Sequence, residues 1–111
     1  MPNTFNYNLN EVAFALIETG EKKVEGRLFK NSFTKIKKGD VIIFKNKDNF
    51  LKVRVVKTTR YNTFKEMLIK EQILRVTPLS KSLNESLSIY RKFYSEKDEL
   101  KYGVLAITIE K

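Results

Sequence analysis

Apolar residues near the start of the chain recur with the spacing of one helix face. These positions are Leu9, Val12, Ala13, Leu16 and Ile17, at i, i+3, i+4, i+7 and i+8. Such a stripe predicts an amphipathic helix. Asn8 with Glu11 is typical of a capping box, and Gly20 suits the residue after the last turn. We therefore predict a helix over residues 9–19, after a short strand at Thr4–Tyr7.

The next segment, Lys23–Lys30, alternates as a strand does. One face carries Val24, Gly26 and Leu28, and the other carries Lys23, Glu25, Arg27 and Phe29. Glu25 and Arg27 are thus predicted to lie on the same face, roughly 7 Å apart. Gly26 has no side chain, which permits a close approach of backbone or helix on the other face.

Two further strands are predicted at Val41–Phe44, after a turn at 37–40, and at Phe50–Lys57, with a hairpin loop between them. Thr63-x-x-Glu66 and Ser82-x-x-Glu85 each open a helix, and Tyr102–Ile109 is a closing strand. Strands and helices do not alternate as βαβ units, which favours an antiparallel or mixed barrel with helices around it. The prediction is a single α+β domain over residues 1–111, with about five to six strands and about three helices.

Composition removes several kinds of chemistry. The 111 residues include no cysteine and no histidine, so thiolate nucleophiles, the usual metal ligands and the usual general base are absent. We expect no metal and no cofactor. No apolar run approaches the roughly 18 residues that span a bilayer, and the polar start resembles no secretory signal. A soluble, cytoplasmic protein without a membrane partner is expected.

The formal net charge of +9 favours a polyanionic partner. Most of the positive residues are lysine, and lysines at 30, 35, 37, 38, 45, 47 and 52 gather around two predicted loops. They are candidates for a rim that follows phosphates. A lysine- and asparagine-rich coding bias produces the same composition without any nucleic-acid role, so charge alone leaves both interpretations open.

Four landmarks resemble the ASCH domain family. Gly20-Glu21-Lys22-Lys23-Val24-Glu25-Gly26-Arg27 fits its G-x-K-x-x-E-x-R signature. The stretches 38–44 (KGDVIIF), 61–64 (YNTF) and 102–107 (YGVLAI) are similar to later family landmarks and follow in the same order. The resemblance covers nearly the whole chain and implies a PUA-like β-barrel. It also implies a partner such as RNA, single-stranded nucleic acid, or a nucleoside or nucleotide.

The signature residues can act in two ways. Glu25 can accept a hydrogen bond from an exocyclic amine, and Arg27 can donate to a phosphate or a base carbonyl. In the alternative, Glu25 and Arg27 hold each other in a salt bridge and Lys22 is a solvated turn residue. Nearby cations lower the pKa of Lys22 and Glu25 raises it, and the sequence does not decide which effect is larger.

We therefore predict an RNA- or nucleotide-binding domain with a pocket around Lys22, Lys23, Glu25 and Arg27, roofed by the segment between Tyr61 and the helix that Ser82 opens. Additional candidates for nucleic-acid contact are Lys37, Lys38 and Tyr61, the last as a stacking platform.

An enzymatic function remains as an alternative. Some family members hydrolyse acetylcytidine, and ribonuclease activity is associated with others. If this chain is an enzyme, its candidate catalytic residues are Lys22 and Glu25. The family's hydrolase uses a lysine, a threonine and a later glutamate, but Glu25 occupies the threonine position, and residues 79–82 contain no acid. We therefore expect little or no hydrolysis.

Overall fold

The structure is a computed structural model, and it describes residues 2–111. Its elements, in chain order, are β1 (Thr4–Asn8), α1 (Glu11–Glu18), β2 (Val24–Leu28), the 3-10 helix η1 (Asn31–Lys35), β3 (Val41–Asn46), β4 (Asn49–Tyr61), α2 (Phe64–Glu71), α3 (Ile73–Val76), α4 (Leu83–Arg91), α5 (Glu96–Tyr102) and β5 (Val104–Glu110).

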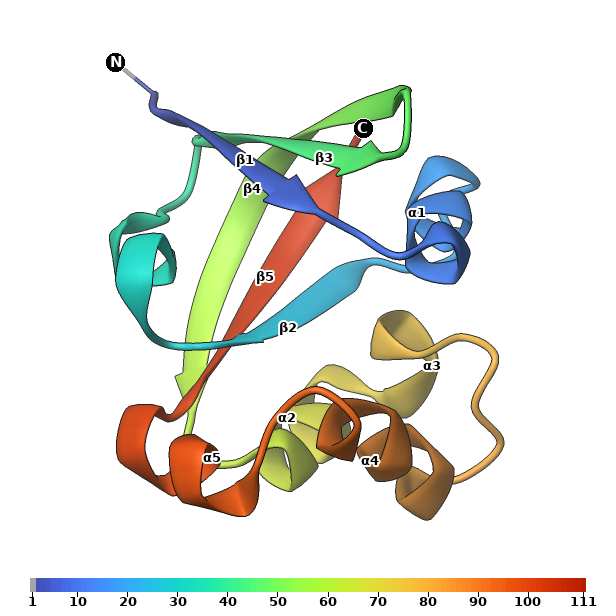
Figure 1. Ribbon diagram of the computed structural model, residues 1–111, viewed down its shortest axis with the longest axis vertical. Helices are drawn as coiled ribbons and strands as arrows, with labels where there is room; N and C mark the ends of the chain where they lie inside the picture. The colour runs from blue at the N-terminus through green and yellow to red at the C-terminus, as the bar shows by residue number, and fades with distance from the viewer. Residues whose placement is uncertain (1) are drawn as a thin grey trace.

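The five strands form one mixed sheet in the order β1-β3-β4-β5-β2 (Figure 1). β1 runs parallel to β3, and the other neighbouring pairs are antiparallel. The sheet curls into a half-barrel whose edges are β1 and β2. This confirms the predicted α+β class and mixed sheet. Over residues 2–111 the sheet is surrounded by five α-helices rather than about three, because α3 and α5 were not predicted.

The longest strand gives the sheet its curl. β4 has 13 residues and pairs with β3 along its first half and with β5 along its second. A register shift between Val55 and Lys57 leaves one extra residue on β4. A bulge of this kind bends the strand and increases its twist, which brings the two edges of the sheet toward each other.

Capping residues explain where the helices begin, and one of them differs from the prediction. Asn10, not Asn8, caps α1, with its side chain accepting from the Ala13 amide at 2.8 Å. Asn8 still pairs with Lys45 as the last residue of β1, so the helix begins after it. The predicted caps Thr63 and Ser82 are confirmed, each accepting from an amide three residues later at 3.1 Å. Gly20 follows α1 with φ 85°, as predicted.

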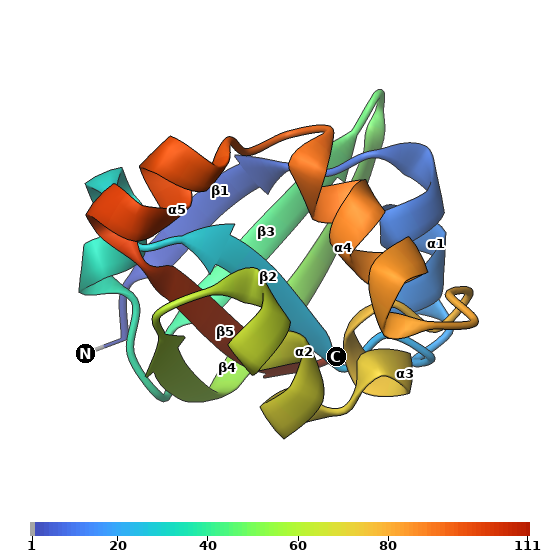
Figure 2. The same cartoon turned by 90° about the horizontal axis from the view of Figure 1, so that it is seen from below.

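Two apolar clusters cover the two faces of the sheet. One lies between the curled sheet and α1 and includes Phe14, Ile42, Phe44, Val55 and Ile107. The other packs α2, α3 and α4 against β2 and β5, as the view from below shows (Figure 2). Gly26 makes this second packing possible, because a Cβ there would lie 2.8 Å from Met67 Sδ and 2.9 Å from Tyr90 Oη. The predicted close approach at Gly26 is thus confirmed.

Among residues 2–111, none of the helices combines the length and the apolar character that crossing a membrane requires.

Candidate functional site

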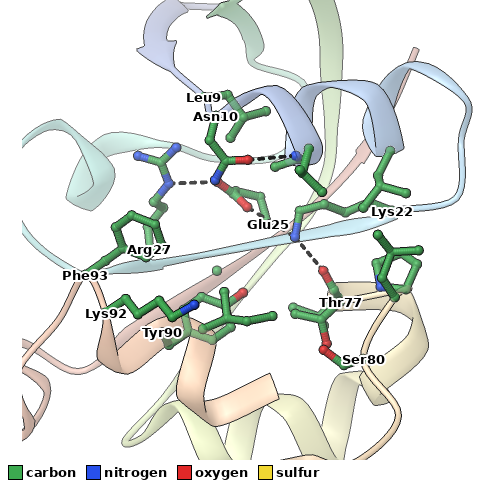
Figure 3. A pocket seen from close by; sticks show the side chains of 18 of the residues that line it. Leu9, Asn10, Lys22, Glu25, Arg27, Thr77, Ser80, Tyr90, Lys92 and Phe93 are labelled. Atoms are coloured by element: carbon green, nitrogen blue, oxygen red, sulfur yellow. Dashed lines mark hydrogen bonds and ion pairs between the residues drawn. The ribbon is translucent and has the colours of Figure 1, made fainter. Parts of the chain in front are cut away.

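A cleft of about 700 Å³ lies between α1, β2 and the end of α4. Its fourth side is the segment Val76–Ser80, which links α3 to α4. Figure 3 shows Lys22, Glu25 and Arg27 converging at the floor of this cleft, with Thr77, Tyr90 and Phe93 around them. Most of the lining is apolar with a few convergent polar groups, which is the usual character of a small-molecule site.

The floor is a chain of three charged side chains. Glu25 Oε1 lies 3.3 Å from Lys22 Nζ, and Glu25 Oε2 accepts from Arg27 Nε at 2.8 Å. Only 6% of the Lys22 side chain, 8% of Glu25 and 17% of Arg27 is exposed. Of the alternatives raised by the sequence, the salt bridge between Glu25 and Arg27 is present, and this salt bridge lines the cleft. The solvated Lys22 that belonged to the same alternative is wrong, because Lys22 is buried.

Burial and mutual attraction shift the ionisation of this floor. Burial lowers the pKa of Lys22, and this effect exceeds the opposing attraction of Glu25. Burial on its own raises the pKa of Glu25, but Lys22 and Arg27 outweigh it, so the carboxyl pKa is lowered. For Arg27, burial lowers the pKa, but the pairing with Glu25 exceeds it and the net shift is upward. The sequence left the direction of the shift in the pKa of Lys22 open, and burial is the larger effect.

Arg27 also connects the two edges of the half-barrel. Its Nη2 donates to the carbonyl of Asn8 at 3.2 Å, at the end of β1. Its guanidinium lies 5.7 Å from the ring centre of Tyr7 and 5.2 Å from that of Phe33, which are distances for cation–π attraction. These contacts hold the guanidinium in one place beside the cleft.

The segment Val76–Ser80, which forms the roof of the cleft, carries polar groups that the sequence analysis did not identify. Lys22 Nζ donates to the carbonyl of Val76 at 2.5 Å, which ties the floor to the roof. The next residue, Thr77, shares a hydrogen bond of 2.7 Å with the Ser86 hydroxyl. Ser80 also lines the cleft, and its buried hydroxyl has no hydrogen-bond partner among the described residues. Buried polar groups rarely lack a partner, so this hydroxyl is an unsatisfied position in the wall of the cleft.

The mouth of the cleft is unusually apolar. Val12, Leu79 and Phe93 all line it and are 58%, 66% and 62% exposed. Lys92 stands beside Phe93 at the same opening (Figure 3). The predicted apolar stripe of α1 is therefore divided: Ile17 is buried in the core, whereas Val12 faces the cleft.

The structure brings together only some of the predicted site residues. Lys22, Glu25 and Arg27 line the cleft, and the predicted roof segment does cover it. Lys23 is exposed beside the cleft and is not part of its lining, and Lys37 and Lys38 are exposed before β3. Tyr61 lies in a separate hollow with Arg60, where its hydroxyl donates to Glu71. Burial and Glu71 together raise the pKa of Tyr61 to about 12.

Sequence reasoning missed Lys92 and Phe93, because both follow α4 and neither belongs to a motif. No group of three or more metal-ligating side chains lies close enough to hold a metal ion within residues 2–111.

Comparison with known proteins identifies the family. The sequence model of the ASCH domain family matches residues 8–111, so the chain belongs to the ASCH domain family. The high-resolution crystal structure of the ASCH domain from Lactobacillus crispatus has the same fold, with a TM-score of 0.66 and 17% identity over 96% of this chain and 79% of that one.

Two solved structures are much more similar in sequence. The crystal structure of hypothetical protein PH0355 is 47% identical, with a TM-score of 0.91, over 96% of this chain and 97% of that one. The solution structure of protein PF0455 from Pyrococcus furiosus is 46% identical, with a TM-score of 0.80, over 96% of both chains. No curated protein matches the chain.

Proposed function

We propose that this protein binds RNA and that an unpaired nucleobase enters the cleft above Lys22, Glu25 and Arg27. The observation that carries the proposal is the convergence of these three signature residues on the floor of a single apolar-walled cleft. The cleft volume of about 700 Å³ lies within the range of small-ligand sites. It accommodates a base with its sugar and phosphate.

Each part of the cleft has a counterpart in a nucleotide. The floor offers a carboxylate for an exocyclic amine, and Arg27 and Lys92 offer donors for phosphate oxygens. The exposed ring of Phe93 at the mouth gives a surface on which a base can stack. RNA is read mainly through such unstacked bases, since the grooves of its duplex present little to side chains.

A matched pair of phenylalanines tests this proposal. We expect Phe93→Ala to weaken binding of a short oligoribonucleotide about tenfold, since stacking on an aromatic side chain contributes about 1–3 kcal/mol per base. Phe50→Ala is the control, because Phe50 is 66% exposed on β4 and lies outside the cleft. Fluorescence anisotropy measures both affinities. Equal effects of the two substitutions would exclude the cleft as the binding site.

One observation favours a second candidate, hydrolysis of an acetylated cytidine. Lys22 lies on the floor of the cleft, and burial lowers its pKa, which is the direction that a general base requires. In this reaction Lys22 removes a proton from water, the water oxygen attacks the acetyl carbonyl, and the amide C–N bond breaks. Acetate leaves, and the exocyclic nitrogen takes up the proton. The chain departs from the family's hydrolase at Glu25, whose negative charge raises the pKa of Lys22 and so opposes the effect of burial.

We still expect little or no turnover, and a direct assay decides the matter. Acetylcytidine is incubated with the protein, and release of cytidine is followed by chromatography. Robust release that Lys22→Ala abolishes would make hydrolysis the function. Release that survives Lys22→Ala would come from a contaminating enzyme.

A further inference from the structure

A second positively charged surface lies at the far end of β2 from the cleft roof. It combines the end of β4, the segment after β2 and the last turn of α5. We name it the distal basic surface and define it by three cations and two aromatic rings: Lys30, Arg60, Lys101, Phe29 and Tyr102. Figures 1 and 2 both show α5 on the opposite side of the molecule from α1, which forms one wall of the cleft.

The cations of this surface are ordered on aromatic rings. The guanidinium of Arg60 lies 3.8 Å from the ring centre of Phe29. The ammonium groups of Lys30 and Lys101 lie 5.2 Å and 5.1 Å from the ring centre of Tyr102. Cation–π contacts at these distances restrain the side chains and leave their N–H groups free to donate outward.

No carboxylate neutralises these cations. None of the three forms an ion pair with any acidic side chain in the part of the chain that the structure describes, unlike Arg27, Arg54 and Arg91. The two ammonium groups that share Tyr102 are within about 10 Å of each other, the Debye length at moderate salt, so they repel. A polyanion would relieve this repulsion.

A polar hollow of about 580 Å³ adjoins these side chains and includes Arg60, Lys101 and Tyr102. Its acidic member, Glu66, accepts a hydrogen bond from the amide of Asn62 at 3.1 Å. The hollow therefore presents a net positive surface next to aromatic rings.

We propose that the distal basic surface binds the phosphodiester backbone of single-stranded RNA, at a site separate from the cleft. Glu25 and Phe29 are four residues apart on extended backbone, about 13 Å, so one strand can reach both places. Phosphates contact the three cations, and the adjacent rings favour a nucleic acid over an acidic protein. This site is additional to the proposed base-binding cleft, and the proposal does not depend on that cleft.

The test compares two triple variants that remove the same charge. One is Lys30→Gln, Arg60→Gln, Lys101→Gln. The control is Lys57→Gln, Lys65→Gln, Lys70→Gln, at exposed lysines of β4 and α2. Affinity for a short labelled oligouridylate is measured by anisotropy between about 50 and 200 mM salt. Circular dichroism checks that both variants are folded.

We expect the first variant to reduce the slope of log affinity against log salt by about 2, since each phosphate contact contributes about 0.7. Its affinity at low salt should fall about tenfold or more, and the control should lose much less. Equal losses in both variants would overturn the proposal. So would competition by polyglutamate as effective as that by RNA, since the surface would then recognise carboxylates.

Binding of a mononucleotide distinguishes the proposed distal basic surface from the proposed base-binding cleft. Cytidine monophosphate carries an exocyclic amine from which the Glu25 carboxylate can accept a hydrogen bond. Followed by NMR shift changes, it should bind the first variant as it binds the unmodified protein and should bind Phe93→Ala more weakly. If the mononucleotide binds but oligouridylate is insensitive to the first variant, only the distal basic surface is wrong. If the mononucleotide does not bind while oligouridylate depends on the three cations, only the cleft is wrong.

Discussion

At the scale of single residues, the floor of the cleft depends on Glu25. Its two carboxylate oxygens are shared between Lys22 and Arg27, so each cation has a partner that offsets the loss of water. Removing the carboxylate would leave two buried cations facing each other. A carboxyl group at this position therefore stabilises the fold as well as shaping the site.

Glu25→Gln should lower the free energy of unfolding near neutral pH by about 3 kcal/mol, because it leaves a buried charge without its partner. The pKa of Glu25 is lowered from 4.5 in the folded state. Its stabilising contribution is hence fully present above about pH 4.5 and is lost as the pH falls through the folded value. Urea unfolding over a pH series should show a steep acid limb in the unmodified protein and a flatter one in the variant.

Glu110→Gln is the control for this series. Glu110 pairs with Arg54 at the surface, where both side chains are more than half exposed, and such pairs contribute about 0–1 kcal/mol. Its unfolding curve should follow that of the unmodified protein at every pH. An equally flat acid limb in Glu110→Gln would show that general surface charge, not Glu25, causes the acid sensitivity.

At the scale of elements, α5 is held by one buried carboxylate. Glu99 Oε2 accepts from the amide of Phe64 at 2.7 Å, and Oε1 accepts from Arg91 Nη2 at 2.7 Å. One side chain thereby joins the beginning of α2, the end of α4 and α5. This junction fixes the loop after α4 that carries Lys92 and Phe93 to the cleft.

Glu99→Ala should therefore lower the free energy of unfolding by about 3 kcal/mol, because it leaves a buried amide and an arginine without their acceptor. Glu96→Ala should cost less than about 1 kcal/mol, since that side chain is 80% exposed and lies 3.9 Å from Arg91 Nε. Thermal or urea unfolding of the two variants gives the comparison. Similar losses for both would mean that Glu99 is not the junction.

The elements also show what local sequence can predict. Thr63 and Ser82 correctly predict where their helices begin, because the capping hydrogen bond joins residues only three positions apart in the sequence. Ser95 caps α5 in the same way, with Asp98 three residues later, so α5 had a usable signal. The start of α1 was ambiguous locally, because Asn8 and Asn10 can both cap a helix. Asn10 is the cap because β1 continues through Asn8 in its pairing with β3, a contact distant in sequence.

At the scale of the whole molecule, the candidate cleft was only partly accessible to sequence reasoning. Strand geometry alone places Glu25 and Arg27 of the signature on one face. Lys22 precedes β2, and its side chain reaches Glu25 from the turn before the strand. The contribution of Phe93 depends on how α4 lies across β2, which periodicity does not specify. Burial of Lys22 likewise depends on the roof at Val76, and this explains why the direction of its pKa shift was not predictable.

The net charge of +9 gives a prediction for the molecule as a whole. RNA affinity should be micromolar or weaker and should fall steeply with salt, through release of counterions. The two proposed surfaces offer five cations that can contact phosphates. Arg27 and Lys92 belong to the cleft, and Lys30, Arg60 and Lys101 belong to the distal basic surface. For a single strand this number corresponds to a slope of log affinity against log salt of about −3.5.

Anisotropy of a labelled oligoribonucleotide between about 50 and 200 mM salt measures this slope. An oligomer of the same bases on an uncharged backbone is the control, and its weaker binding should not vary with salt. Absence of binding at low salt, or binding of RNA that is insensitive to salt, would contradict the electrostatic account. In that case the lysine-rich composition would reflect coding bias, and the positive surface would have no part in recognition.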